Sequence, residues 1–346
     1  TYLEQQSFTE PMFVFAIMVI AGSRPILQFA MLCVKKIAKI IPWSDGMAFY
    51  FVTLSFVPLL GSFITEPAAM TLAGLIFLER YYSKGITTKL KYATLGVLFV
   101  NISIGGTMTT FAAPPVLMVA TKWGWDLAFM FSTFGWKAII VVLVNTLVAT
   151  FVFRRELSEI HFDKESQEKR VPLPVFFTHL FFLVGVVVFA HHPEVFMGLL
   201  LFFIGFAHAY ERYQDRLILR EGLLVAFFLA GLVVLGAQQK WWLQPMLVGM
   251  DTTVLFYGAT FLTAFTDNAA LTYLGSLLEG TSPEFQYSLV AGAVTGGGLT
   301  VIANAPNPAG FAILKESFED DSIHPLGLLV AALPPTFVAI LAFQFL

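Results

Sequence analysis

Two short stretches, TEPAA at residues 65–69 and TDNAA at residues 266–270, decide how this chain folds. Each places a carboxylate, Glu66 or Asp267, in the middle of a long apolar run. A charged side chain inside a membrane costs about 2.5–3.5 kcal/mol on insertion scales and usually serves a function. Each stretch also carries a residue that breaks or caps a helix. We therefore expect both stretches to form the tips of helical hairpins.

The composition indicates an integral membrane protein. Of the 346 residues, 57% are hydrophobic and only 12% are charged, which is too few charges to cover the surface of a water-soluble domain. The apolar runs have the length of membrane-spanning helices and lack the roughly ten-residue alternation of a membrane barrel. We predict an all-α polytopic membrane protein whose partners are the lipid bilayer and small ions, with no nucleic acid partner.

In the first half of the chain, the hairpin is expected at residues 46–82 and the next membrane helix at 90–121. This helix contains NISIGGTMTTFAAPP at residues 101–115, whose glycine, threonine and proline residues should unwind it. Unwound backbone survives in a bilayer only where protein surrounds it or where it lines a cavity. We therefore predict a broken transmembrane helix after the first hairpin.

The same order returns in the second half, with a hairpin at 246–279 and a broken helix at 285–316. The unwound string is now GGGLTVIANAPNPAG, at residues 296–310. Glycine- and proline-interrupted segments at corresponding places in two halves indicate the binding site of a transporter. The predicted divisions are a first repeat at 1–153, a charged cytoplasmic link at 154–173 and a second repeat at 174–346.

The basic residues predict the orientation of the two repeats. If the first hairpin opens to the cytoplasm, nearly all basic residues of the links lie on the cytoplasmic side, as the positive-inside rule requires. Counting either hairpin as two full crossings would put later basic links on the wrong side, which favours re-entrant hairpins. The repeats are then inverted and the tips meet near the midplane of a multi-pass protein in the plasma (inner) membrane.

The motifs resemble a known family. TEPAAMTLAG and TDNAALTYLG at the tips, with GGTMTTFAAPP and GGGLTVIANAPNPAG in the broken helices, resemble the ion transporter superfamily of arsenite, citrate or dicarboxylate carriers and, in particular, its sodium/proton antiporter members. The resemblance implies a scaffold domain, a moving transport domain and a homodimer that works as an elevator. The dicarboxylate carriers have Ser-Asn-Thr at each tip. The acidic tips found here argue against a carboxylate substrate, because they would repel an anion.

A small hard cation prefers carboxylate, hydroxyl, amide and carbonyl oxygens. The expected ion-binding residues are Asp267, Asn268, Thr266, Asn304 and Asn307 in the second half and Glu66, Thr65, Thr107, Thr109 and Thr110 in the first. We predict Na⁺ binding at Asp267 and Glu66, with Asp267 as the principal ligand and Glu66 as its coupling or gating partner. No other cofactor is expected. The simpler alternative is that both carboxylates only cap helices.

Two basic residues lie within predicted spans. Lys137 and Arg24 are candidates for counter-charges of the tip carboxylates, and the alternative is that they reach the membrane surface or form structural pairs.

Competition between a proton and a cation for one carboxylate site is the simplest mechanism of antiport. The predicted function is therefore a Na⁺/H⁺ antiporter with alternating access of the elevator type. A second interpretation is a sodium- or proton-coupled small-anion carrier that holds its anion with Asn304, Asn307 and helix N-termini. An intramembrane acid/base enzyme using Glu66 and Asp267, or a channel, fits less well. The sequence has no nucleophile or metal motif such as HExxH, so we predict a protein that is not an enzyme.

Overall fold

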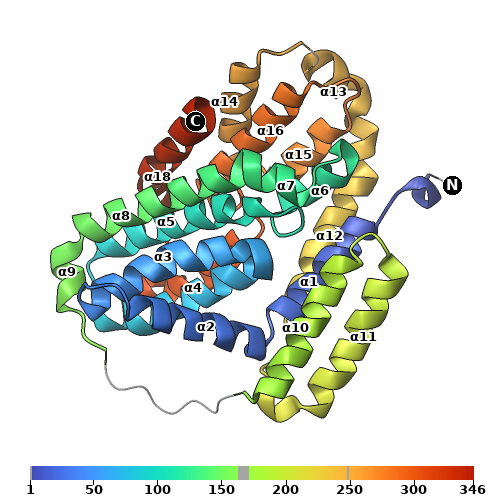
Figure 1. The fold of residues 1–346 in the computed structure, drawn as a ribbon. Coiled ribbons are helices and arrows are strands. Elements are labelled where there is room, and N and C mark those ends of the chain that lie inside the picture. The colour runs from blue at the N-terminus through green and yellow to red at the C-terminus, as the bar shows by residue number, and fades with distance from the viewer. Residues whose placement is uncertain (1, 163–170, 248) are drawn as a thin grey trace. The chain divides into compact units, whose positions relative to one another are not determined.

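The computed structural model describes residues 2–162, 171–247 and 249–346, and the regular elements in these ranges are helices (Figure 1). The chain forms two compact units. One comprises Thr1–Cys33 and Asp163–Gln238, and the other comprises Val34–Phe162 and Gln239–Leu346. Each unit is built from segments far apart in the sequence. The predicted repeats are continuous halves of the sequence, whereas each compact unit combines segments from both halves. The repeats therefore stay a prediction.

The first unit is a bundle around α1 (Thr9–Ala21), which packs against α10, α11 and α12. Its helices are α10 (Leu173–Val188), α11 (Pro193–Ala209), α12 (Leu219–Gly236) and the first part of α2 (Arg24–Ala38). Large apolar side chains such as Phe181, Phe202 and Phe227 remain exposed on α10, α11 and α12. Such a surface suits lipid and would be unfavourable in water.

The second unit contains both predicted hairpins and both broken helices. In the first half of the chain these are α3 (Asp45–Ile64), α4 (Glu66–Arg80), α5 (Thr88–Gly105) and α6 (Pro114–Trp123). In the second half they are α14 (Thr252–Thr263), α15 (Asn268–Ser276), α16 (Pro283–Gly296) and α17 (Asn307–Leu314). The interruptions after α5 and α16 fall within the glycine- and proline-rich strings.

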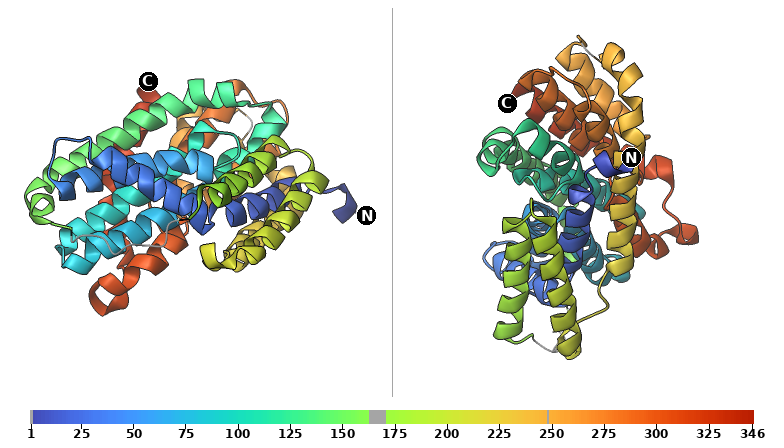
Figure 2. Two further views of the ribbon diagram at one scale, coloured as in Figure 1. Left: turned by 60° about the horizontal axis from the view of Figure 1, so that its bottom comes forward. Right: turned by 90° about the vertical axis from the view of Figure 1, so that its right-hand side faces the viewer.

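The remaining helices of this unit surround that core. They are α7 (Leu127–Met130), the π-helical turn η4 (Phe131–Gly135), α8 (Trp136–Val152), α9 (Arg154–Glu159), α13 (Lys240–Leu247) and α18 (Pro325–Phe345). α8 packs against α3, α5 and α18 (Figure 2). Short 3₁₀ turns lie at 3–5, 82–84, 106–108, 211–213, 237–239, 315–317 and 319–321.

The structure shifts one predicted boundary. Residues 246 and 247 belong to α13, and the second hairpin begins only at Thr252. The physical reason is the cap: Asp251 Oδ1 accepts hydrogen bonds from the backbone N–H groups of Thr253 (2.9 Å) and Val254 (3.2 Å). In the predicted cytoplasmic link, α9 occupies the first residues and α10 starts at Leu173, while residues 163–170 lie outside the described residues.

Four described helices are long and apolar enough to cross a membrane, or up to five if α1 and α2, bent by 63°, form one span. The arms of the second hairpin have only 12 and 9 residues, or about 18 and 14 Å of helix, so neither crosses the roughly 30 Å hydrocarbon core alone. α3, with 20 residues, is long and apolar enough to cross the membrane. The re-entrant form of the first hairpin therefore stays a prediction.

Candidate functional site

The break of the second broken helix touches the tips of both hairpins. Ala303 and Asn304 are neighbours between α16 and α17. The Ala303 carbonyl accepts a hydrogen bond from the backbone N–H of Asn268 at 3.1 Å, and Asn304 Nδ2 donates to Glu66 Oε2 at 2.9 Å. Glu66 and Asn268, the residue after Asp267, are thus bonded to two adjacent residues of the break, although Glu66 and Asp267 are 201 residues apart (267 − 66) in the sequence.

Glu66 is the more deeply buried of the two carboxylates, with 0% of its surface exposed. Its Oε2 is bonded to Asn304, but its Oε1 has no hydrogen-bond partner in the part of the chain that the structure describes. A Cβ added to Gly106 would lie 2.3 Å from Oε1, so a larger residue there would displace this carboxylate. Within the described residues no lysine or arginine forms an ion pair with this carboxylate. A buried carboxylate without a cation favours a proton or a bound ion.

The residue before Glu66 has an unusual backbone. Thr65 adopts φ 74° and ψ 150° between α3 and α4, close to a region that glycine occupies almost alone and that costs other residues about 1–3 kcal/mol. Its buried Oγ1 has no partner among the described residues and does not cap α4. Strained backbone of this kind gathers at functional sites, which supports the tip as part of the site.

Asp267 has a different environment. It is half-buried and caps α15, because its Oδ1 accepts hydrogen bonds from the N–H groups of Ala269 (2.8 Å) and Ala270 (3.2 Å). The N-terminal end of a helix favours a negative charge. The capping role considered from the sequence is therefore present in the structure. Capping uses one carboxylate oxygen and does not exclude ion binding by the other.

The asparagines of the second half supply buried oxygens. The Oδ1 atoms of Asn268, Asn304 and Asn307 have no partner among the described residues, and all three side chains are at most 1% exposed. Asn307 Nδ2 donates to the carbonyl groups of Gly297 and Thr300, both at 2.8 Å, which fixes the unwound break. Buried polar atoms are nearly always paired in folded proteins, so three unpaired oxygens indicate a place for a cation or water.

The threonines of the two tips and breaks contribute less directly. Thr266 is exposed and donates to Leu262 O in its own helix (3.0 Å). Thr107 donates to Ile104 O (2.7 Å), Thr109 donates to Ser62 O (2.6 Å), and Thr110 is half-buried. These bonds hold the first break in place.

Each hairpin is joined to the broken helix of its own half. In the first half, Asn101 Nδ2 donates to Leu54 O (2.9 Å), a Cβ at Gly105 would meet Pro58 O (2.6 Å), and Thr109 Oγ1 reaches Ser62 O. The contacts advance by four residues on both helices, so α3 and the broken helix run side by side in the same direction. Pro58 explains the first contact, because it has no N–H for the Leu54 carbonyl.

In the second half the same arrangement depends on closer backbone packing. A Cβ at Gly292 would lie 2.4 Å from Phe256 O, and one at Gly296 would lie 2.3 Å from Thr260 O. Thr300 Oγ1 then donates to Ala264 O at 2.8 Å. Again the contacts advance by four residues on each helix. The second arm of each hairpin also packs against the broken helix of the other half: α4 packs against α17, and α15 packs against α6.

Comparison with known proteins agrees with this architecture. A family model described as "Putative Na+/H+ antiporter" matches residues 1–346, the whole chain. The chain belongs to this antiporter family. Among solved structures, the YdaH transporter of Alcanivorax borkumensis, described as having an unusual topology, matches with a TM-score of 0.51 and 14% sequence identity over 97% of this chain and 82% of that chain. This likeness shows the fold alone. No curated protein matches the sequence.

Two buried threonines near the candidate site of this antiporter-family chain were not predicted from the sequence. Thr263 on α14 and Thr295 on α16 are 0% exposed, and their Oγ1 atoms have no partner among the described residues. Single threonines are common in membrane helices, so neither stands out by type. Their positions could have identified them, since Thr263 lies three residues before the tip at Thr266 and Thr295 directly precedes the glycine triplet.

The two candidate counter-charges bind elsewhere. Lys137 Nζ donates to the Tyr287 hydroxyl at 2.8 Å and lies 4.7 Å from the centre of its ring. Arg24 pairs with Asp215 at 3.4 Å within the first unit. Neither contact involves a tip carboxylate, so a counter-charge role stays a prediction for both residues.

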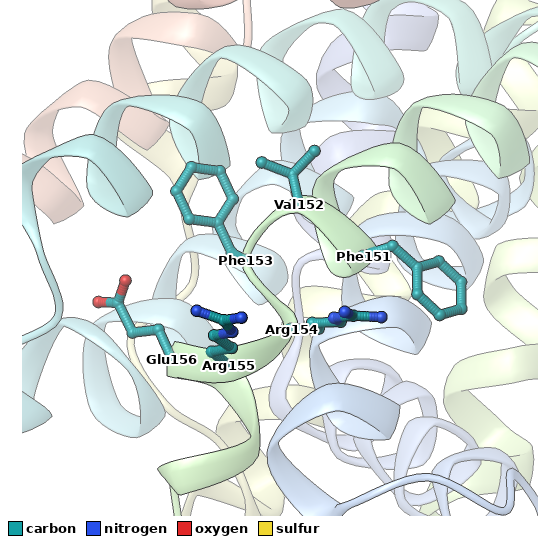
Figure 3. Close-up of a pocket in the computed structure, with 6 residues that line it drawn as sticks. All are labelled: Phe151, Val152, Phe153, Arg154, Arg155 and Glu156. Atoms are coloured by element: carbon teal, nitrogen blue, oxygen red, sulfur yellow. The ribbon is translucent and has the colours of Figure 1, made fainter.

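A surface hollow lies at the junction of α8 and α9, lined by residues 151–156 (Figure 3). It contains none of the predicted ion-binding residues, so it is not part of the candidate antiport site.

Proposed function

We propose that this protein is a secondary active transporter that exchanges Na⁺ for protons at a site formed by Glu66, Asn304 and Asp267. The observation that carries the proposal is Glu66, a fully buried carboxylate with one oxygen bonded to an amide and the other without a partner among the residues that the structure describes. Membership of the antiporter family supports the same conclusion. Carboxylate and amide oxygens match the ligands that a small hard cation prefers.

In this proposal the free Oε1 of Glu66 carries either a proton or the cation. Removal from water favours a neutral carboxyl group, and an arriving cation replaces the proton by providing the missing opposite charge. Asp267 adds a second negative charge, fixed by the N-terminus of α15. We propose that Glu66 is the exchanging ligand, and that Asp267, which we predicted from the sequence to be the principal ligand, is the fixed one.

The wider mechanism rests on the arrangement of the second unit. We propose that the two halves are inverted repeats, because in each half a hairpin arm runs beside its broken helix and the second hairpin arm packs on the broken helix of the other half. One compact unit holds every candidate ligand while the other holds none. This division suits an elevator in which one unit carries the site.

Two parts of the proposal rest on the sequence alone. We propose a homodimer, which follows from the resemblance to the ion transporter superfamily. We propose a location in the plasma (inner) membrane, with the link between the repeats in the cytoplasm, because the basic residues of the links gather on one side.

The alternatives have less support from the site. An anion carrier of the kind considered above would hold its anion with Asn304 and Asn307, but the amide group of Asn304 is bonded to Glu66 and that of Asn307 is bonded to two carbonyl groups. Of the three buried asparagines, Asn268 alone keeps an amide donor without a partner among the described residues. An acid/base enzyme would need a substrate pocket at Glu66 and Asp267. The hollow described above is lined by residues 151–156 and by neither of these carboxylates.

The test is transport in liposomes that contain a pH-sensitive dye. Addition of Na⁺ should move protons in the opposite direction, and Li⁺ and K⁺ in place of Na⁺ would define the cation. Glu66→Gln should reduce proton movement to that of protein-free liposomes, because an amide cannot exchange a proton. Glu221→Gln, which makes the same change at an exposed position of the first unit, is the matched control and should transport like the parent. If no cation moves protons in the parent, or if Glu66→Gln leaves the exchange unchanged, the proposal is wrong.

A further inference from the structure

The outward side of α8 carries an apolar stripe. Ile140, Val144, Val148 and Val152 are spaced four residues apart and are 38%, 37%, 55% and 68% exposed, respectively. Residues at this spacing lie on one face of a helix. In a membrane protein such a face contacts acyl chains.

The stripe ends at two arginines. Arg154 and Arg155 follow directly after α8, are exposed, and line the hollow at residues 151–156. Neither belongs to an ion pair within the described ranges 2–162, 171–247 and 249–346. In Figure 3 the side chain of Arg154 extends toward the ring of Phe151, while Glu156 extends to the opposite side. The hollow therefore combines two positive charges with one carboxylate and three apolar side chains.

The acidic residue of the hollow has another partner. Glu156 accepts hydrogen bonds from the backbone N–H of Thr87 (2.6 Å, to Oε1) and from its hydroxyl group (2.9 Å, to Oε2). These bonds hold both carboxylate oxygens at the start of α5. Glu156 is thus bonded to Thr87 and forms no ion pair with either arginine in the described part of the chain.

A neighbouring tryptophan supports a position at the membrane surface. Trp43 packs edge-on against Phe151 and Phe51, with ring centres 5.3 Å apart in both pairs. Tryptophan is enriched where the headgroups meet the hydrocarbon core. The hollow next to Phe151 then lies at the depth of lipid phosphate groups.

We propose that this hollow binds the headgroup of an anionic phospholipid. The phosphate lies between Arg154 and Arg155, which match phosphate oxygens through charge-assisted hydrogen bonds, and one acyl chain follows the stripe along α8. The site is separate from the antiport site and does not depend on the proposed function. The occupant is a lipid rather than free phosphate, because the apolar stripe continues from the charged end.

The experiment compares lipids on the full chain in detergent. Binding of phosphatidylglycerol and phosphatidylcholine with the same acyl chains is measured by native mass spectrometry and by thermal melting. The parent should bind phosphatidylglycerol more tightly and melt at a higher temperature in its presence, as ligand linkage requires. Arg154→Gln/Arg155→Gln should lose about 30-fold in affinity for phosphatidylglycerol, as expected for two surface arginines, and none for phosphatidylcholine.

The matched control is Arg216→Gln/Arg220→Gln, which removes the same charge from exposed positions of the first unit and should keep the preference. Equal binding of the two lipids by the parent would overturn the proposal, and this measurement needs no variant. Equal losses in both double variants would overturn it as well. Inorganic phosphate at millimolar concentration should not displace the lipid, and displacement would identify a simple anion site instead.

Discussion

The two hairpins are held against their broken helices by different chemistry. In the first, Pro58 leaves the Leu54 carbonyl without its helical partner, and Asn101 and Thr146 donate to that carbonyl from α5 and α8 at 2.9 and 3.1 Å. In the second, Gly292 and Gly296 bring two backbones into direct contact. The first hairpin therefore depends more on polar side chains that link several helices, and the second depends more on close backbone packing between two helices.

The two carboxylates follow the same difference. Glu66 lies at the tip of the hairpin that several helices surround, and it is fully buried. Asp267 lies at the tip of the shorter hairpin, is half-buried, and receives two backbone N–H groups. The comparison indicates that the first tip can bury a carboxylate because its surroundings are more extensively bonded.

The largest effect on stability is expected at Gly296. In Gly296→Ala the new Cβ would meet the Thr260 carbonyl oxygen at 2.3 Å, a backbone atom that cannot move without shifting α14. We expect a loss of about 3 kcal/mol, at the upper end for overpacking, measured as unfolding in detergent. Gly258→Ala on α14 has nothing within 4 Å and should be close to the parent. Equal stability of the two variants would show that the second hairpin is not fixed by backbone contact.

The next largest effect on stability is expected at Asn101, which bonds the carbonyl that Pro58 leaves without a helical partner. Asn101→Leu removes a donor from the Leu54 carbonyl and an acceptor from Asn145 (3.0 Å), so we expect a loss of about 2 kcal/mol. Pro58→Ala restores an N–H that can bond Leu54 within α3. The double variant should therefore lose less than the sum of the single variants.

The control for this cycle is Thr150→Val, because among the described residues the Thr150 hydroxyl donates only to Thr146 O in its own helix (2.7 Å). It should change stability little in either background. Additive losses for Pro58→Ala and Asn101→Leu would show that the proline and the asparagine act independently.

Much of this architecture is readable in the sequence. Proline, glycine and acidic residues within apolar runs predicted the hairpin tips at Thr65 and Asp267 and the breaks near Gly105 and Gly297, because these residues disfavour helix wherever they occur. The motifs also predicted an antiporter, and the family match over the whole chain agrees.

The relative burial of the carboxylates was not readable. Glu66 and Asp267 lie in similar sequence surroundings, and their difference arises from contacts with residues far along the chain, such as Asn304 for Glu66. The Asn101–Asn145 bond was missed for the same reason, since an asparagine in a span shows no partner in its own segment. The start of the second hairpin at 246 was wrong because the capping role of Asp251 outweighed the continuity of the apolar run.

A smaller effect tests the second tip. Asp267→Asn keeps an oxygen that can cap α15, whereas Asp267→Ala removes the cap, so only the alanine variant should lose about 1 kcal/mol of stability. If Asp267 is a charged ligand of the antiport site, both variants should weaken the apparent affinity for Na⁺ in the liposome assay. Normal Na⁺ affinity in Asp267→Asn would show that Asp267 only caps α15 and that Glu66, of the two tip carboxylates, is the ion ligand.

The smallest effect concerns the open ends of the hairpins. At the second, Lys240 on α13 donates to Glu279 and holds the pKa of that exposed carboxyl below its usual value of 4.5. A lowered pKa in the folded state stabilises the protein above the unfolded value, and the gain disappears as the pH falls through the folded value. The melting temperature of the parent should therefore exceed that of Glu279→Gln slightly at pH 7 and match it near pH 3, and salt should reduce the difference. The first hairpin is closed by a neutral bond from the Tyr81 hydroxyl to Gly46 O (2.7 Å), so the difference between the parent and Tyr81→Phe should not change over this pH range. A pH-dependent difference at Tyr81, or none at Glu279, would contradict the contrast between a charged and a neutral closure.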